Sequence, residues 1–288
     1  MPPKRPPSPT LAAIPTVPLP TWSEDPLAAR ARSIWGAADF LPIARSFEPG
    51  AREFISRLAL RVGQSVLDVA CGTGNLAIPA ASAGARVTGV DIAPNLIAAA
   101  RAEARAAGVP VQFDVGDVEL LPYADQQFDA TITMFGAMFG ARPDRVAAEL
   151  LRVTRSGGRI AMANWMPSGF VVDLLRAHTA IVPPPAELPS PLLWGDEATV
   201  RLRFGNAVTA FTCVPRSIHL RFEIPPAAVS ELFATCYGPT VATLKAAETV
   251  SRQALRDSLT RLFEKHNIAG AGATEVVGEY LEVYARVA

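Results

Sequence analysis

Val66-Leu67-Asp68-Val69-Ala70-Cys71-Gly72-Thr73-Gly74-Asn75 is the stretch of this chain that decides its fold. An apolar run leads into a glycine loop, and the loop opens onto a predicted helix over residues 75–83. Glycines in such a loop let the backbone approach a small ligand closely. The loop fits the pattern G-x-G-x-x-A from Gly72, and Asp91 follows 19 positions later, where a carboxylate suits ribose hydroxyls. By itself the pattern fits a dinucleotide and a methyl donor equally well.

Strands and helices alternate regularly around this loop. The apolar patterns predict strands over residues 65–70, 86–90, 111–115, 129–135 and 159–165, and helices over 75–83, 94–107 and 145–154. Alternation at this spacing implies parallel βαβ units with right-handed crossovers, so the fold class is α/β. Ligands of such sheets bind beyond the carboxyl ends of the strands, and Asp68, Asp91, Asp117 and Phe135 all fall there.

Proline-rich stretches and the end of the alternation divide the chain into four predicted segments. Eight prolines among the first 20 residues remove backbone donors, which predicts a flexible tail over residues 1–22. A helical cap over 23–60 precedes a binding core over 61–166, and residues 167–288 are predicted to hold the remaining core strands with an inserted helical lid. In this last segment the patterns predict a helix over 195–204, paired strands over 207–214 and 217–223, helices over 225–247 and 250–266, and a closing strand over 279–287.

Composition restricts the classes of partner. The chain carries 27 basic and 27 acidic residues, so no charge surplus favours nucleic acid or an anionic membrane. Its three cysteines follow no zinc-binding pattern, which predicts no metal and a reduced, cytoplasmic compartment. No apolar run is long enough to span a bilayer, and the first residues lack the apolar region of a signal peptide. The oligomeric state stays open, with a homodimer as one option.

Asp68 helps to separate the two ligands that the glycine loop allows. A pyrophosphate is held by a helix N-terminus and bare amides, and a carboxylate just before the loop would oppose it electrostatically. S-adenosylmethionine instead carries an ammonium and a sulfonium, which Asp68 would help to organise. Asp117, at the end of the third predicted strand, suits the adenine amino group, with Val118 over the ring. Each residue has a structural alternative, since Asp68 would also cap the loop and Asp117 a turn.

Five stretches resemble, in chain order, the motifs of class I S-adenosylmethionine-dependent methyltransferases: residues 66–74, 87–91, 116–122, 128–130 and 157–159. The similarity is greatest to the ubiquinone/menaquinone-methyltransferase-like branch, which modifies small molecules, and it covers residues 30–166 well. The resemblance implies a doubly wound, seven-stranded, mostly parallel sheet with helical cap elements, and S-adenosylmethionine as the cofactor. It also implies the roles of the cofactor-binding residues: Ala70, Gly72 and Gly74 face the methionine portion, Asp91 and Ile92 the ribose, Asp117 and Val118 the adenine, and Met134 or Phe135 the sulfur.

The residues that would hold the methyl acceptor follow no motif. Methyl transfer from a sulfonium needs alignment and exclusion of water, and a base only if the acceptor must lose a proton. We expect an apolar pocket over the fourth and fifth strands, roofed by the N-terminal helices. Its expected members are Trp35, Phe40, Met138, Phe139 and Trp165, together with Met134 and Phe135. His178 is the best candidate for a base, and Tyr237 is a candidate for orienting the acceptor, although both also suit plain structural roles.

The predicted function is therefore enzymatic. We expect S-adenosylmethionine-dependent methyl transfer to a small organic acceptor, at an oxygen, nitrogen or carbon atom, by in-line displacement at the sulfonium methyl. One alternative is an NAD-dependent oxidoreductase, against which Asp68 and Asp117 count. A second is a protein that keeps S-adenosylmethionine for other chemistry or for structure, because the site motifs would then be unchanged.

Overall fold

Seven strands form a single sheet in the computed structural model, which describes residues 25–288. The sheet order is β3-β2-β1-β4-β5-β7-β6. The first five strands run parallel, and β7 lies antiparallel between β5 and β6. The strands are β1 (Ser65–Val69), β2 (Arg86–Asp91), β3 (Val111–Val115), β4 (Phe128–Met134), β5 (Thr154–Trp165), β6 (Val208–Phe222) and β7 (Thr274–Val287). The predicted doubly wound, mostly parallel sheet is confirmed, while the predicted tail over residues 1–22 lies outside the described residues.

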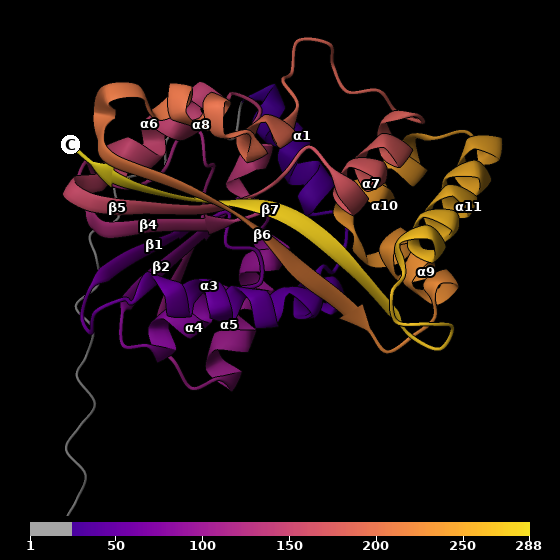
Figure 1. The fold of residues 1–288 in the computed structure, drawn as a ribbon, viewed down its shortest axis with the longest axis horizontal. Helices are drawn as coiled ribbons and strands as arrows, with labels where there is room; N and C mark the ends of the chain where they lie inside the picture. The colour runs from indigo at the N-terminus through magenta and orange to yellow at the C-terminus, as the bar shows by residue number, and fades with distance from the viewer. Residues whose placement is uncertain (1–24) are drawn as a thin grey trace, which may run out of the picture.

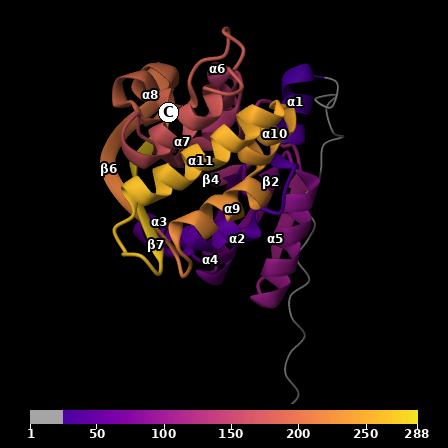
Figure 2. The same ribbon diagram turned by 90° about the vertical axis from the view of Figure 1, so that its right-hand side faces the viewer.

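Helices cover both faces of the sheet and one of its ends (Figure 1). One face carries α3 (Glu48–Leu58), α4 (Ala77–Ser82) and α5 (Pro94–Ala106), and the other carries α6 (Pro143–Val153) and α8 (Glu197–Phe204). Figure 2 faces the end toward which the parallel strands run, where further helices gather. These are α1 (Pro26–Trp35), α2 (Leu41–Ala44), α7 (Gly169–Thr179), α9 (Pro226–Cys236), α10 (Gly238–Ala246) and α11 (Thr249–His266). The end of the sheet that should bind ligand is therefore roofed.

Local sequence explains where the elements near this roof begin. The Asp25 side chain accepts a hydrogen bond from the Leu27 amide at 2.9 Å, and Pro26 then starts α1 with its φ already suited to a helix. In α6, Val146, Ala147, Leu150 and Val153 are buried, which is the one-sided pattern of a helix packed on a sheet.

None of the helices between residues 25 and 288 is both long and apolar enough to cross a membrane.

Two element predictions in the last third of the chain were wrong. The expected strand pair is one continuous strand, β6, in which Pro215 pairs with Leu281. β6 is the edge strand of the sheet, and proline, which has no backbone N–H, is tolerated in an edge strand because only one side of that strand is paired. The expected helix over 225–247 is interrupted at Tyr237, which has extended backbone angles. Pro239 explains the break, since inside one continuous helix it would remove a hydrogen bond and clash with the preceding turn.

Candidate functional site

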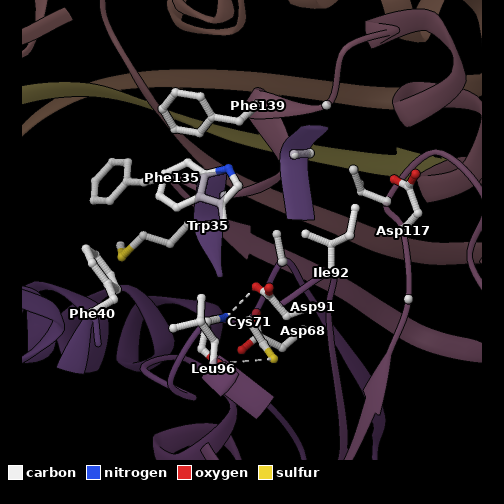
Figure 3. Close-up of a pocket in the computed structure, with 18 of the residues that line it drawn as sticks. Trp35, Phe40, Asp68, Cys71, Asp91, Ile92, Leu96, Asp117, Phe135 and Phe139 are labelled. Atoms are coloured by element: carbon white, nitrogen blue, oxygen red, sulfur yellow. Dashed lines mark hydrogen bonds between the residues drawn. The ribbon is translucent and has the colours of Figure 1, made fainter. Parts of the chain in front are cut away.

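A cavity lies at the carboxyl ends of β1, β2 and β4, and residues of α1 also line it; Figure 3 shows side chains that surround it. Nine of the ten predicted cofactor residues line it: Asp68, Ala70, Gly72, Asp91, Ile92, Asp117, Val118, Met134 and Phe135. Five predicted acceptor-side residues line it as well: Trp35, Phe40, Phe139, Trp165 and Tyr237. The structure thus brings together, in one cavity, residues that are spread over 200 positions of sequence.

Asp91 holds the glycine loop in place. Its Oδ2 accepts a hydrogen bond from the Gly72 amide at 2.9 Å, and its Oδ1 accepts one from the Ala93 amide at 2.9 Å. Gly72 has a positive φ of 53°, which suits glycine and turns its amide toward this carboxylate. Burial raises the pKa of Asp91, and the surrounding amides act against that rise. Because each carboxylate oxygen can accept more than one hydrogen bond, Asp91 can still accept from ligand hydroxyls.

Asp68 is the most deeply buried carboxyl of the cavity, at 1% exposure. Its Oδ2 has no hydrogen-bond partner among the described residues. Burial raises the pKa of Asp68 well above its usual range, the Ala77 amide opposes this, and the charge of Asp91 adds to it. A buried unpaired acceptor costs free energy that a cationic ligand group would recover. The carboxyl therefore fits a bound ammonium, and the same feature argues against a pyrophosphate.

Asp117 is the third carboxyl at the strand ends, and it lies apart from Asp68 and Asp91 in Figure 3. Its Oδ1 accepts a hydrogen bond from the Glu119 amide at 2.9 Å, and burial is the main cause that raises its pKa. Arg142 bonds to Glu119 at 2.9 Å and to Asp25 at 2.7 Å. This bridge connects the start of α1 to the segment that carries Asp117.

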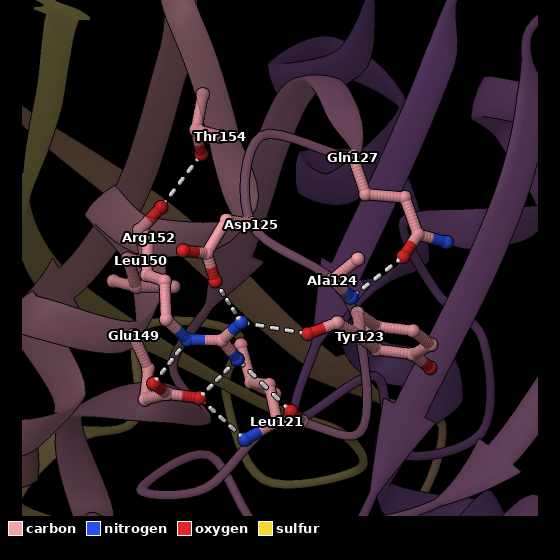
Figure 4. Close-up of polar contacts among 9 residues, drawn as sticks. All are labelled: Leu121, Tyr123, Ala124, Asp125, Gln127, Glu149, Leu150, Arg152 and Thr154. Carbon is pink, nitrogen blue, oxygen red and sulfur yellow. Dashed lines mark hydrogen bonds and ion pairs between the residues drawn. The ribbon is translucent and has the colours of Figure 1, made fainter. Parts of the chain in front are cut away.

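The chain after Asp117 is fixed from α6 by one arginine (Figure 4). Arg152 donates to the carbonyls of Tyr123 at 2.7 Å and Leu121 at 3.0 Å, and pairs with Glu149 and Asp125. Glu149 in turn accepts from the Leu121 amide at 2.6 Å. Together these bonds provide partners for backbone groups of a loop that has no regular secondary structure. The loop follows Asp117 directly, so the protein itself helps to fix the position of Asp117 before a ligand binds.

Aromatic rings form the other part of the cavity. Phe135 stacks on Trp165 with ring centroids 3.5 Å apart and planes within 6°. Phe47 contacts both rings, at 5.9 and 6.1 Å. Phe135 has a φ of 58°, a left-handed conformation that is costly for a residue with a bulky side chain. Its amide donates to the Ala163 carbonyl at 2.8 Å, which together with the stack holds the ring at the cavity.

A second group of rings closes this apolar part from the helical roof. The ring centroid of Trp35 lies 5.1 Å from that of Phe139 and 6.1 Å from that of Tyr237. The ring centroid of Phe40 lies 6.2 Å from that of Tyr237. We call the seven rings together the aromatic wall: Trp35, Phe40, Phe47, Phe135, Phe139, Trp165 and Tyr237. Figure 3 shows the labelled members of this wall above and beside the carboxylates of Asp68 and Asp91.

Three predicted site residues do not line the cavity. Gly74 has a φ of 92°, and a Cβ there would lie 3.2 Å from Ile78, so it shapes the turn into α4. Met138 is 1% exposed and packs in the core behind the wall. His178 is buried in α7, where its Nε2 lies 2.7 Å from the Thr240 hydroxyl. Burial lowers the pKa of His178 to about 4, so it is neutral at physiological pH and joins α7 to α10.

Several lining residues were not predicted from the sequence. Phe47 is the most important, because it contacts the Phe135–Trp165 stack from below the roof. Asn75 lines the cavity at the end of the glycine loop. Its side-chain amide donates a hydrogen bond to the Ala44 carbonyl at 2.7 Å, which ties the end of α2 to this loop. The remaining unpredicted lining residues include Leu27, Ala28, Ala31, Leu96 and Glu119.

Comparison with known proteins identifies the family. A family model described as a methyltransferase domain matches residues 66–158, which carry Asp68, Asp91 and Asp117. The uncharacterized protein Rv1403c of Mycobacterium tuberculosis is 37% identical over 229 residues, covering 78% of this chain and 83% of that protein. The chain belongs to the S-adenosylmethionine-dependent methyltransferases. The matched residues include the carboxyl groups of Asp68, Asp91 and Asp117, which line the cavity.

Two other similarities agree with this assignment. Demethylmenaquinone methyltransferase of Paenarthrobacter aurescens is 35% identical over 125 residues, covering 43% of this chain and 47% of that enzyme. A structure of a putative methyltransferase from Bacillus halodurans superposes with a TM-score of 0.54 at 19% identity, covering 82% of this chain and 97% of that one. The second likeness concerns the fold, and it confirms the seven-stranded methyltransferase sheet with its flanking helices.

Proposed function

We propose that this methyltransferase acts on a small organic acceptor that is aromatic or lipid-like, at an oxygen, nitrogen or carbon atom. The observation that carries the proposal is the division of one cavity into an acidic part and an aromatic wall. The acidic part suits a cationic methyl donor, and the aromatic wall suits an apolar acceptor beside it. The similarity to a demethylmenaquinone methyltransferase supports an acceptor of this class.

The cofactor roles follow from what each side chain offers. Asp68 would hold the ammonium and Asp91, with Ile92, the ribose, while Asp117 and Val118 would hold the adenine. The backbone of Ala70 and Gly72 would lie against the methionine portion of the cofactor, and Met134 or Phe135 would flank its sulfur. When bound, S-adenosylmethionine supplies a methyl group that is already activated for in-line displacement.

The contribution of the chain itself is positioning and exclusion of water. Correct alignment of two reactants supplies roughly 7–11 kcal/mol of a reaction barrier. The stack of Phe135 on Trp165, and the closure of the roof by Asp25–Arg142 and Asn75–Ala44, provide a rigid and largely apolar surface for this alignment. His178 packs behind Tyr237 without lining the cavity, and its Nε2 is engaged by the Thr240 hydroxyl, so we assign no protein base to the reaction.

An activity assay tests this proposal. The purified full chain would be incubated with S-adenosylmethionine and a panel of neutral aromatic, prenylated and amine acceptors, and S-adenosylhomocysteine release would be measured. We expect release with at least one aromatic or lipid-like acceptor. Binding of S-adenosylmethionine without release for any member of the panel would count against methyl transfer to this acceptor class.

Two coarser predictions accompany this proposal. The division into a cap over 23–60, a cofactor-binding core over 61–166 and a lid-bearing segment over 167–288 is the domain organisation we propose. A cytoplasmic location is also proposed, supported by Cys71, Cys213 and Cys236, all of which are unpaired.

A further inference from the structure

The acceptor part of the cavity has a simple chemical character. Of the seven rings in the aromatic wall, Tyr237 alone carries an oxygen, and the indole nitrogens of Trp35 and Trp165 are the other polar atoms on these rings. Every polar group on the wall is therefore neutral. An acceptor in contact with the wall would find stacking surfaces and few hydrogen-bonding groups.

Tyr237 is held rigidly at the junction of two helices. It lies between α9 and α10, and its ring contacts Phe233 at 5.3 Å in addition to Trp35 and Phe40. The next residue, Gly238, packs so closely on α1 that an added Cβ would lie 2.4 Å from the Ile34 carbonyl oxygen. A side chain fixed on all sides in this way can present its hydroxyl at a defined place.

The Tyr237 hydroxyl makes no hydrogen bond to any residue between 25 and 288, in contrast to that of Tyr123, which donates to Asp114 at 3.0 Å. Burial raises the pKa of Tyr237, so the hydroxyl stays protonated and serves as a neutral donor and acceptor. Tyr237 is half-buried and lines the cavity, so its hydroxyl, which no described residue engages, is free to hydrogen bond an oxygen of a ligand.

The charges around the cavity restrict the acceptor further. Four carboxylates line it, those of Asp68, Asp91, Asp117 and Glu119, whereas no lysine, arginine or histidine does so among the described residues. An acceptor with a carboxylate or phosphate would have no protein counter-charge at the wall and would be repelled by these groups.

We propose that Tyr237 is the specificity-determining residue of the acceptor subsite. Its hydroxyl hydrogen bonds a neutral oxygen of an aromatic hydroxy or keto compound that lies against the aromatic wall and carries no anionic group. The inference rests on the proposed function, because it assumes that the acceptor occupies the part of the cavity left by the methyl donor.

Binding of three matched probes to the full chain tests this inference without any turnover. The probes are 2-naphthol, naphthalene and 2-naphthoate, titrated by calorimetry into the protein saturated with S-adenosylhomocysteine. Tyr237→Phe removes only the hydroxyl, and Tyr123→Phe removes a tyrosine hydroxyl outside the cavity as the matched control. Saturation with S-adenosylhomocysteine is measured first, so a failure of the donor site is recognised separately.

We expect the wild-type protein to bind 2-naphthol about tenfold more tightly than 2-naphthoate. Tyr237→Phe should weaken 2-naphthol binding about five- to tenfold, the usual effect of one lost hydrogen bond, and leave naphthalene binding nearly unchanged. Tyr123→Phe should leave the ratio of the two affinities as in the wild type. Equal losses for 2-naphthol and naphthalene in Tyr237→Phe, tighter binding of 2-naphthoate, or no binding of any probe to the saturated protein would each overturn the inference.

Discussion

Asp91 offers the sharpest single substitution in the donor site. In the structure its two oxygens accept hydrogen bonds from Gly72 and Ala93 at 2.9 Å, so its position is set by the protein before any ligand binds. Asp91→Ala removes both the proposed ribose contact and the anchor of the glycine loop. A charge-assisted hydrogen bond contributes roughly 1.5–3 kcal/mol. This corresponds to S-adenosylmethionine binding that is about 10- to 150-fold weaker.

Isothermal titration calorimetry with S-adenosylmethionine and S-adenosylhomocysteine measures this loss directly. Asp91→Asn separates the two contributions, because the amide keeps one acceptor oxygen and loses the charge, and we expect an intermediate affinity. Asp173→Ala is the matched control, since Asp173 is a carboxylate outside the cavity that pairs with Lys265. Wild-type affinity in a folded Asp91→Ala protein would refute the ribose assignment.

Three further predictions follow from the contacts of the site. Burial raises the pKa of Asp68, which means that its charged form opposes folding. Asp68→Asn removes this charge and should raise the melting temperature at pH 7 by about 2–4 °C. The same substitution should weaken cofactor binding. That gain should disappear as the pH falls below about 4, where the carboxyl is also neutral in the unfolded chain; a constant gain in a pH series of calorimetric melts would be inconsistent with it. Arg152→Ala removes the cation that pairs with Glu149 and the donor to the Leu121 and Tyr123 carbonyls, and should lower the free energy of unfolding by about 3 kcal/mol in urea titrations. A loss near zero would speak against the anchored loop. His178→Gln should change kcat by no more than about threefold, whereas a loss of about 10²–10⁴ would restore His178 as a base.

The clustering of the proposed donor-site residues in one cavity was predictable because its signals are local. The glycine loop, Asp91 and Asp117 each lie at the carboxyl end of a strand that its apolar pattern predicts. Parallel strands bring their carboxyl ends to the same edge of the sheet. The charge of Asp68 was enough to favour a cationic ligand over a pyrophosphate. A glycine pattern does not tell which glycine lines the cavity, as Gly72 does, and which one fits the turn against Ile78, as Gly74 does.

The acceptor side was less predictable because it is built from distant contacts. Tyr237 reaches the wall only because Pro239 interrupts the helix and Gly238 packs on α1. No nearby residue indicates that the Nε2 of His178 is engaged by Thr240, 62 positions further along the chain. Phe47 lies in a 3-10 turn whose periodicity is too short to show which way it faces. Long-range packing decides all of these positions, and a single sequence records it only weakly.

A crystal structure of the full chain with S-adenosylhomocysteine tests the central claim most directly. The account predicts the amino group beside Asp68, the ribose hydroxyls within hydrogen-bond distance of Asp91, the adenine between Asp117 and Val118, and the sulfur facing the aromatic wall. A ligand bound in the reverse direction, with its adenine against Phe135 and Trp165, would contradict the account, as would a complex in which Asp68 and Asp91 make no contact with the ligand.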